Sequence, residues 1–552
     1  METTLKLLTL ALALLASVEA SAYSFAQDGI YYNILSETDN TLEVTYEQFN
    51  EDSYSYESSY NGDVEIPSEI IYNGLTYTVT AIGENAFSGC QELSSVKLPE
   101  TITSIGMCAF VGCSNLNTID IPDGVSDIGE SAFGGCITLA LINLPNTLTT
   151  IGAGAFGSCE KLSTINLPES LTTIGESAFT RCRNLTSIII PNGVTRIEDS
   201  MFLYCTNLSS VTLPETLTSI GSSAFESCTN LSSLTIPEPL TSIGNSAFAY
   251  CPNLTDITLP ETLSSIGNGT FAHCVNLTSI TIPKGVIAIG EKLFMKCNKL
   301  ESIDVASQNP NYASDDGILY NKDITTLIAC PGAKTIVSVP ETVTTIGTYA
   351  FYYCKVSSIT LPTSLTTIGN EAFSSCSKLT SIILPDGVTT VGNSAFSFCS
   401  SLSSITIPNS VSTIGTSAFV YCSALKTIQM QCKTPLNCRP GFDNTVYTNA
   451  TLYVPAGSRS VYESTAPWSN FSNIVERVFT GIDEIEGAGN TGLLISVNNG
   501  ALSVNGLDDN AAITVFDANG RMVYSGTNRT IENLVPGLYI VKAGNHTAKA
   551  VL

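Results

Sequence analysis

Residues 243–260 read IGNSAFAYCPNLTDITLP, and the chain repeats this stretch, with small variations, fourteen times between Ile82 and Cys422. The step between copies is almost always 23 residues. A fixed period of this length predicts a solenoid, in which no unit can bury its own apolar face and stacking supplies the core. The phenylalanine of each copy lies at Phe87, Phe110, Phe133, Phe156, Phe179, Phe202, Phe225, Phe248, Phe271, Phe294, Phe351, Phe373, Phe396 and Phe419.

Each unit is expected to contain two short extended segments and one tight turn. In the pattern L-x-x-I-x-L, Leu254, Ile257 and Leu259 alternate along an extended chain that ends at a proline without an N–H group. A second extended segment ends at Gly267, and Ala-Phe-x-x-Cys then fits one helical turn that places ring and thiol in the core. The predicted fold is a β-rich repeat solenoid of 23-residue units with short helical turns, stacked in parallel about 4.8 Å apart.

The L-x-x-I-x-L segment followed by a 23-residue return resembles the BspA-like leucine-rich repeat family of surface proteins. The stretch I-G-x-x-A-F-x-x-C distinguishes that family from other leucine-rich repeats, and the resemblance covers most of residues 81–430. It implies a leucine-rich repeat fold. It also implies, less directly, adhesion to host matrix proteins or to other cells, since one repeat scaffold can serve many partners.

The remaining segments are predicted to flank the solenoid. The short apolar run near the N-terminus, followed by small residues, predicts a secretory signal peptide, and no later stretch has the roughly 20 apolar residues of a membrane helix. The tyrosine-rich, acidic region that follows predicts a β-rich cap, with a dedicated acidic binding site as the alternative. The predicted order is signal peptide 1–22, N-terminal cap 23–80, solenoid 81–430 with an inserted hairpin at about 302–345, C-terminal cap 431–480, acidic linker 481–492 and a last domain 493–552.

Residues 493–552 are expected to form a small β-sandwich-like domain. Asn519-Gly520 is a hairpin turn signal between two alternating segments. The order of these segments, closing on Lys549 and an apolar end, resembles the C-terminal sorting domain of the bacterial type IX secretion system. This resemblance implies export across an outer membrane, removal of the domain, and attachment to the cell surface or release.

The 18 cysteines do not form the pattern of a disulfide framework. Fourteen occupy one column of the repeat, from Cys90 to Cys422. Parallel side chains in a packed column suit a bridge poorly, so we expect buried thiols. Cys432 and Cys438 lie outside the column and are the best candidates for a disulfide, with free thiols as the alternative. Neither set has the spacing of a zinc site, and we predict no metal and no cofactor.

Composition argues against catalysis and against nucleic acid. The only histidines are His273 and His546, so a nucleophile activated by histidine would have to be built around one of them. The net charge of −26 disfavours nucleic acid and acidic membranes as partners. We therefore expect a non-enzymatic protein without catalytic residues, whose partner is a protein of a host or bacterial surface, or alternatively a glycan.

Two faces of the solenoid compete for that partner. The first, the strand face, carries hydroxyl groups that suit either an exposed, soluble sheet or hydrogen bonds to a glycan or an extended polypeptide. Its outward positions include Ser210, Thr212, Ser233, Thr235, Asp256, Thr258, Ser279, Thr281, Ser404 and Thr406.

The second face is the position just before the column cysteine, which we call the edge stripe. Arginine and tyrosine, which recur there, are enriched among the residues that dominate binding energy at interfaces. The alternative is that these side chains only cover the edge of the stack. With Ser227 and Ser375 at the same position, the predicted contact residues are Arg181, Tyr204, Tyr250, His273, Lys296, Tyr353, Phe398 and Tyr421.

One unit departs from the repeat, because Glu198 and Met201 replace its usual glycine and alanine. Arg181, Arg183 and Arg196 lie nearby in the sequence pattern. A local salt-bridge cluster is the structural interpretation, and a partner contact is the alternative. A second basic group lies about four units further on, at Lys284, Lys292, Lys296 and Lys299.

Overall fold

The structure is a computed structural model. It describes residues 23–50, 55–438 and 441–479, and in the last part of the chain 494–498, 501–505, 512–517, 521–528, 530–532, 534, 538–543 and 546–551. The predicted signal peptide at 1–22 and the predicted linker at 481–492 lie outside these residues.

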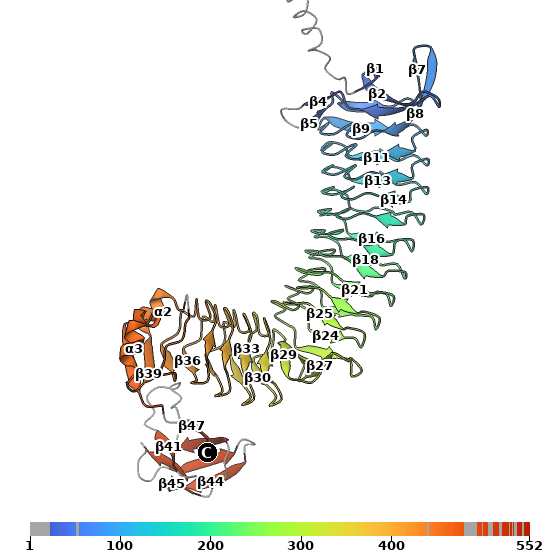
Figure 1. The fold of residues 1–552 in the computed structure, drawn as a ribbon. Coiled ribbons are helices and arrows are strands. Elements are labelled where there is room, and N and C mark those ends of the chain that lie inside the picture. The colour runs from blue at the N-terminus through green and yellow to red at the C-terminus, as the bar shows by residue number, and fades with distance from the viewer. Residues whose placement is uncertain are drawn as a thin grey trace, which may run out of the picture.

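The repeats form a parallel solenoid in which nearly every unit supplies one strand to each of two ladders (Figure 1). Partners in register are usually 23 residues apart, as in Ser233 with Asp256. The strand-face ladder contains β9 Leu93–Lys97, β11 Thr118–Asp120, β13 Leu141–Asn143, β16 Ser187–Ile189, β18 Ser210–Thr212, β20 Ser233–Thr235, β22 Asp256–Thr258, β24 Ser279–Ile282, β26 Ser302–Val305, β30 Ile336–Ser338, β32 Ser358–Thr360, β34 Ser381–Ile383, β36 Ser404–Ile407 and β38 Thr427–Met430.

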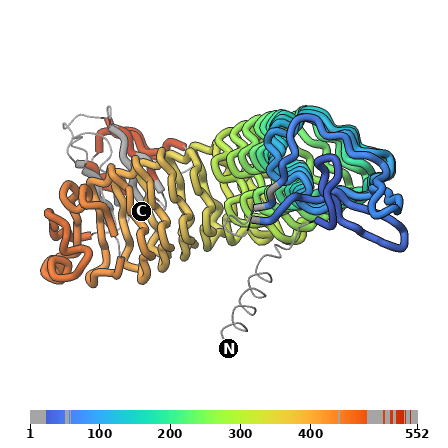
Figure 2. Tube along the Cα trace, turned by 90° about the horizontal axis from the view of Figure 1, so that it is seen from above, coloured from blue at the N-terminus to red at the C-terminus, as the bar shows by residue number. Residues whose placement is uncertain are grey.

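The second ladder is built from two-residue strands that precede the motif glycine or its equivalent. Seen from above, the units of the first half lie one behind another (Figure 2). These strands are β10 Ser104–Ile105, β12 Asp127–Ile128, β14 Thr150–Ile151, β15 Thr173–Ile174, β17 Arg196–Ile197, β19 Ser219–Ile220, β21 Ser242–Ile243, β23 Ser265–Ile266, β25 Ala288–Ile289, β31 Thr345–Ile346, β33 Thr367–Ile368, β35 Thr390–Val391 and β37 Thr413–Ile414.

The motif phenylalanines form a continuous stack inside the column. Neighbouring rings lie nearly parallel, for example Phe225 and Phe248 with centroids 5.4 Å apart. The stack runs from Phe87 to Phe294, stops, and resumes from Phe351 to Phe442. Each ring is buried, and stacked aromatic pairs add about 0.5–1.5 kcal/mol to the stabilisation from burial alone.

The Ala-Phe-x-x-Cys segments form tight turns rather than the helical turns expected from the sequence. Between residues 83 and 430, all of which the structure describes, the chain contains only strands, turns and loops and has no helix. Two residues of each unit adopt positive φ, such as Ser246 at 54° and Tyr250 at 57°. A left-handed residue on each side of the phenylalanine stops a helix from continuing. We call the side of the solenoid made by these segments the turn edge.

The turn edge has its own hydrogen-bond ladder, and its peptide groups are aligned. Ser246, Phe248 and Tyr250 donate their backbone N–H groups to carbonyls of the next unit at 2.8–2.9 Å. The three equivalent residues of the following unit donate their N–H groups in the same direction. All N–H groups of the ladder therefore point toward the C-terminal end of the solenoid. At that end, the Asp443 carboxylate accepts the N–H of Tyr421 at 2.7 Å, which satisfies an outgoing donor.

The column cysteines are free and buried. Most of their thiols donate to the carbonyl of the phenylalanine one unit earlier, as from Cys228 Sγ to Phe202 at 3.3 Å. Burial raises the pKa of Cys228 well above its usual value. Cys432 and Cys438 are also free, and Cys432 Sγ donates to the Pro408 carbonyl instead of forming a disulfide.

These environments predict how the thiols react. In the folded protein at pH 8, a thiol reagent should label Cys108, which is partly exposed, and leave the thiols of the column largely unmodified, because they are buried out of its reach. After unfolding without a reductant, nearly all 18 should react. Recovery of only a few would show that the column is oxidised.

The expected inserted hairpin is part of a sheet that continues into the following units. It consists of β27 Tyr312–Asp315, β28 Ile318–Asn321 and β29 Thr326–Ala329, and β29 pairs in parallel with β31 of the next unit. The core divides here into two clusters, one ending at Leu319 and the other beginning at Ile318. Because these strands widen only one side of the stack, the column bends there toward the turn edge (Figure 1).

The N-terminal strands close the first unit. Tyr60 is buried and packs on Phe87 with ring centroids 4.5 Å apart, and β4 pairs with β5, as a β-rich cap requires. The strands are β1 Phe25–Gln27, β2 Ile30–Ser36, β3 Thr41–Thr45, β4 Gln48–Asn50, β5 Ser55–Glu57, β6 Gly62–Glu65, β7 Glu69–Tyr72 and β8 Leu75–Ile82.

Bulky aromatic residues close the other end, where Trp468 and Phe471 pack against Phe442. This part contains α2 Asn444–Asn449, β39 Thr451–Pro455, α3 Arg459–Ser464, the 3₁₀ helix η1 Trp468–Asn470 and β40 Asn473–Arg477.

The last part of the chain has a separate small core between two antiparallel sheets. Phe516 pairs with Met522 across the expected hairpin, whose turn residues lie outside the described part. The strands are β41 Leu494–Asn498, β42 Ala501–Asn505, β43 Ile513–Asp517, β44 Met522–Gly526, β45 Thr530–Ile531, β46 Leu538–Ala543 and β47 His546–Val551.

Candidate functional site

The edge stripe lies on the turn edge, between two buried columns. Each of its residues follows the buried phenylalanine by two positions and precedes the buried cysteine, and its backbone is left-handed, as at Tyr204 with φ 61°. This conformation turns the side chain away from the core. Tyr250 and Tyr421 are therefore 45% and 55% exposed although both neighbouring columns are buried.

Stacking of the units brings the predicted contact residues together in pairs. Four such contacts occur, with these separations: Arg181 over the Tyr204 ring at 5.8 Å, Tyr250 on His273 at 4.1 Å, Lys296 over Tyr353 at 4.5 Å, and Phe398 on Tyr421 at 4.5 Å. Ser227 and Ser375 interrupt the stripe between these groups. All eight predicted residues thus share one edge, and each packs on a neighbour rather than standing alone.

His273 and Lys296 are successive members of the stripe. Partial burial, and secondly the Lys296 charge, lower the pKa of His273 below its usual value. The imidazole is therefore neutral at pH 7, which suits its stacking on Tyr250. The arrangement presents an amphipathic surface of rings and cations.

Sequence reasoning missed a second set of aromatic contacts beside the stripe. Lys292 lies 4.2 Å from the Tyr349 ring and 5.6 Å from Tyr352. Burial, together with the charges of Tyr353 and Glu371, raises the pKa of Tyr352 to about 12. The signal was available, because the position two residues before the motif phenylalanine is usually small in the repeat but is Lys292 and Tyr349 here.

The outward residues of the strand face point to solvent. Ser233 and Thr235 are exposed on either side of buried Leu234, and the other strands alternate in the same way. At its C-terminal end this face carries an open groove of about 1150 Å³, whose lining includes Thr406 and Arg477. Gln429 also lines the groove, and its buried Oε1 has no hydrogen-bond partner among the described residues.

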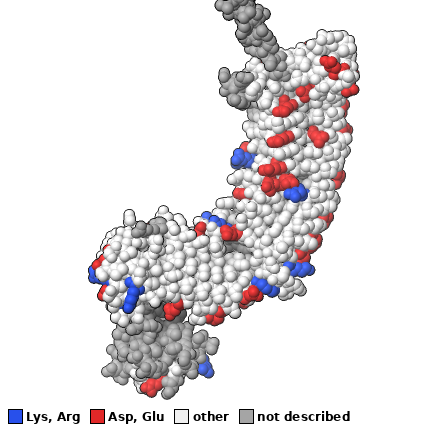
Figure 3. All heavy atoms as spheres, viewed as in Figure 1, with Lys and Arg blue, Asp and Glu red and all other residues white. Residues whose placement is uncertain are grey.

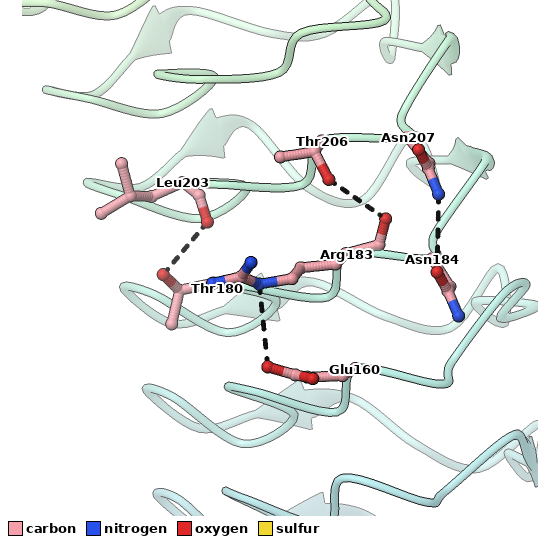
Figure 4. Close-up of polar contacts among 7 residues, drawn as sticks. All are labelled: Glu160, Thr180, Arg183, Asn184, Leu203, Thr206 and Asn207. Atoms are coloured by element: carbon pink, nitrogen blue, oxygen red, sulfur yellow. Dashed lines mark hydrogen bonds and ion pairs between the residues drawn. The ribbon is translucent and has the colours of Figure 1, made fainter.

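The arginines of the divergent unit form local contacts rather than one cluster. Arg183 reaches back to Glu160 of the preceding unit at 3.7 Å (Figure 4), and Arg196 pairs with Glu198 at 3.1 Å. Side chains also link units in register, as in the bond from Asn207 to Asn184 (Figure 4). Arg181 alone of the three packs on the edge stripe. Two of the three arginines therefore form ion pairs, but these pairs are separate and the predicted cluster is wrong.

These features define a leucine-rich repeat solenoid protein with an exposed aromatic and cationic edge. Comparison with known proteins specifies it further: the model of the BspA type leucine rich repeat region matches residues 53–185, 126–255, 172–301, 219–336 and 329–438. The chain therefore belongs to the BspA-type leucine-rich repeat family.

The chain is similar to solved structures of other leucine-rich repeat proteins. A leucine-rich repeat protein from Bacteroides ovatus is 31% identical, with a TM-score of 0.52 over 74% of this chain and 94% of that chain. A leucine rich cell surface protein from Faecalibacterium prausnitzii is 26% identical over 74% and 94%, with a TM-score of 0.37. No curated protein matches the chain. Within the described residues, no helix has both the length and the apolar character needed to cross a membrane.

Proposed function

We propose that this is a non-enzymatic cell-surface or secreted interaction protein, an adhesin that binds proteins of a host or of other bacteria through the edge stripe. The observation that carries the proposal is the row of stacked, exposed rings and cations at the turn edge. Solvated hydroxyl groups on the strand face offer less binding energy than desolvated rings and charged donors.

The backbone favours this role because the stripe is held in place before binding. Each stripe residue lies between two buried residues, and its peptide takes part in the ladder of the turn edge, as the N–H of Tyr250 does. Ordering side chains on binding costs free energy, and side chains that already stack on a neighbour lose less freedom. A fixed row of anchors along a curved surface suits a large protein partner.

Export to the outside of the cell is the second part of the proposal. The apolar N-terminal stretch serves as a signal peptide, and residues 493–552 serve as a type IX sorting domain that directs the protein to the exterior of the outer membrane. The separate core of the last sheets supports this, because a domain that is recognised and removed must fold apart from the solenoid.

Deleting residues 493–552 should leave the protein in the periplasm. The solenoid should keep its melting temperature, because its core does not include residues of the last domain. Fractionation and protease accessibility of whole cells would measure the location, with the full chain as control. Surface display that survives the deletion would rule out the sorting function.

A glycan-binding role on the strand face is the alternative. The groove that includes Thr406, Gln429 and Arg477 favours it, because its polar side chains and a cation could bind sugar hydroxyl or acidic groups. In this reading the protein supports nutrient capture.

Capture experiments with the secreted form would separate the two proposals. The purified protein should retain proteins from host matrix preparations or from intact bacteria, and soluble glycans should not compete. Retention on a glycan array, blocked by the same free glycan, would instead assign the function to the strand face.

A further inference from the structure

The ladder of the turn edge is interrupted at the bend. Up to this point each unit donates three N–H groups to the next, and the last complete set runs from Gly269, Phe271 and His273 to Glu291, Leu293 and Met295. The equivalent donors of the following unit are Lys292, Phe294 and Lys296. Among the described residues, none of these three donates a backbone hydrogen bond to another unit.

The gap arises where the inserted strands interrupt the repeat between Phe294 and Phe351. Strand β25 is the last of its sheet, and β31 pairs with β29 of the insertion instead. Cys330 occupies the register position of a motif phenylalanine. Its N–H donates to the Ala350 carbonyl at 2.7 Å, just as the N–H of Phe351 donates to the Ala372 carbonyl one unit later. A thiol therefore stands where other units place a ring, and the ring stack is broken there.

A cavity of about 110 Å³ occupies the gap. Its floor is apolar and includes Leu293, Leu319 and Cys330. Its lining also includes Lys292, whose backbone N–H has no backbone partner among the described residues, and Thr348, on the other side of the gap in the ladder. No described donor reaches the Thr348 oxygen, so both groups are open to a ligand.

The mouth of this cavity carries rings and charges. Lys292 lies over Tyr349 and Tyr352, and Glu291 is exposed at the rim. Acidic and basic side chains meet on the inner side of the bend (Figure 3). We call the cavity and its mouth the notch, lined by residues 289–295, Leu319, 328–330, 348–350 and Tyr352.

We propose that the notch binds an extended polypeptide segment of the partner protein, with one apolar side chain in the cavity and one peptide group between Lys292 and Thr348. A peptide group supplies a carbonyl for the Lys292 N–H and an N–H for the Thr348 carbonyl, so it completes the interrupted ladder. A carboxylate or phosphate would leave the Thr348 carbonyl facing an acceptor. This inference rests on the proposed function, since it gives one part of the same edge its partner chemistry.

The apolar floor favours a polypeptide over a sugar. A side chain such as leucine or phenylalanine fills a small apolar cavity and gains from leaving water, whereas a sugar would bury hydroxyl groups against Leu293 and Leu319 without partners. Acidic residues beside the apolar side chain would meet the Lys292 ammonium group. The expected segment is therefore extended, with one apolar residue flanked by Asp or Glu.

The test uses an array of blocked octapeptides with Val, Leu, Ile, Met or Phe at the centre and Asp or Gly at the flanks, probed with the mature full chain. Some of these peptides should bind, and calorimetry should give the dissociation constant of the best. Replacing the central amide of that peptide by an ester, which removes its N–H, should weaken binding about fivefold or more. Absence of binding to every peptide would overturn the proposal.

Filling the notch provides the matched variant. Cys330→Phe restores the residue type that every regular unit has in this register, so it should weaken peptide binding at least tenfold and keep or raise the melting temperature. Lys292→Ala should weaken binding severalfold without altering the fold, which keeps the test decisive if Cys330→Phe fails to fold. Lys378→Ala, an exposed lysine away from the notch, is the control and should change nothing.

Other outcomes separate this inference from the function on which it rests. Peptide binding unaffected by Cys330→Phe and Lys292→Ala would place the peptide elsewhere and overturn the notch. Binding of an acidic oligosaccharide, lost in the same two variants, would overturn the polypeptide assignment. Partner capture that is lost when Tyr204 and Tyr421 are replaced, but is unchanged in Cys330→Phe, would overturn this inference alone. The edge stripe would then remain the binding surface.

Discussion

Replacing Phe225 by alanine should lower the free energy of unfolding by about 3–5 kcal/mol, because the change leaves a cavity that the stack cannot close. Phe225 is fully buried, with the Phe202 ring 5.3 Å away on one side and the Phe248 ring 5.4 Å away on the other. Neither ring can move into the space, since each is held by the hydrogen-bonded units that carry it. Urea denaturation followed by circular dichroism would measure the loss.

Phe398→Ala is the matched control. This phenylalanine belongs to the edge stripe, is 51% exposed and stacks on Tyr421. Its removal opens no cavity in the core, and exposed substitutions of this kind usually change stability by about 0.5 kcal/mol or less. Equal losses in the two variants would contradict the assignment of one phenylalanine to the core and the other to the surface.

The solenoid could be predicted because every unit repeats the same sequence pattern. Fourteen copies of one pattern leave a single arrangement that buries Phe225 and its equivalents while leaving Tyr250 and its equivalents outside. The alternation of apolar and polar residues within one unit was enough to predict which columns of residues are buried and which are exposed. The cysteine column was predicted as buried free thiols, and its geometry agrees.

The conformation of the turn edge could not be read from the residue types. Serine and tyrosine carry no strong signal for positive φ, yet Ser246 and Tyr250 both adopt it, and the expected helical turn is absent as a result. The cause lies between units, because this backbone lets the N–H groups of Ser246, Phe248 and Tyr250 all reach the next unit. A pattern within one unit does not contain that information.

Packing between units gives a second reason for the glycine at this position of the motif. A Cβ atom on Gly244 would lie 2.5 Å from the Ser222 nitrogen, so close approach between units, not only the end of a strand, requires glycine there. Glu198 occupies the equivalent position in the divergent unit. The rings of Phe202 and Phe225 just after it are tilted by 17°, more than any other neighbouring pair of motif rings in the described stack.

The notch could not be predicted either. The sequence showed a break in the 23-residue period, but not on which side of the solenoid the break would leave a cavity. The basic group that includes Lys292 and Lys296 was visible. Its relation to Tyr349 and Tyr353 was not, because more than 50 residues separate the two sets and the insertion had no counterpart in the repeat. Three inserted strands widen one side, and the turn edge is left with a gap on the other.

Replacing Arg181, Tyr204, Tyr250 and Lys296 together by alanine should weaken attachment to the protein partner at least tenfold, which corresponds to about 1.4 kcal/mol or more. These side chains provide large contact areas and charge-assisted hydrogen bonds, and they are already held against neighbours, as Tyr250 is against His273. The melting temperature should hardly change, since none of the four belongs to the core. Surface plasmon resonance on the captured partner would measure the affinity.

The matched control replaces Thr212, Thr235, Thr258 and Thr281 on the strand face by alanine. These hydroxyl groups are exposed and well hydrated, so their loss should change the affinity by less than about threefold if the partner binds at the turn edge. Both quadruple variants alter the same number of sites across neighbouring units of one solenoid, so only the face differs. If the threonine set abolishes binding and the edge set does not, the ligand lies on the sheet, and a glycan or an extended chain bound to the strand face becomes the better assignment.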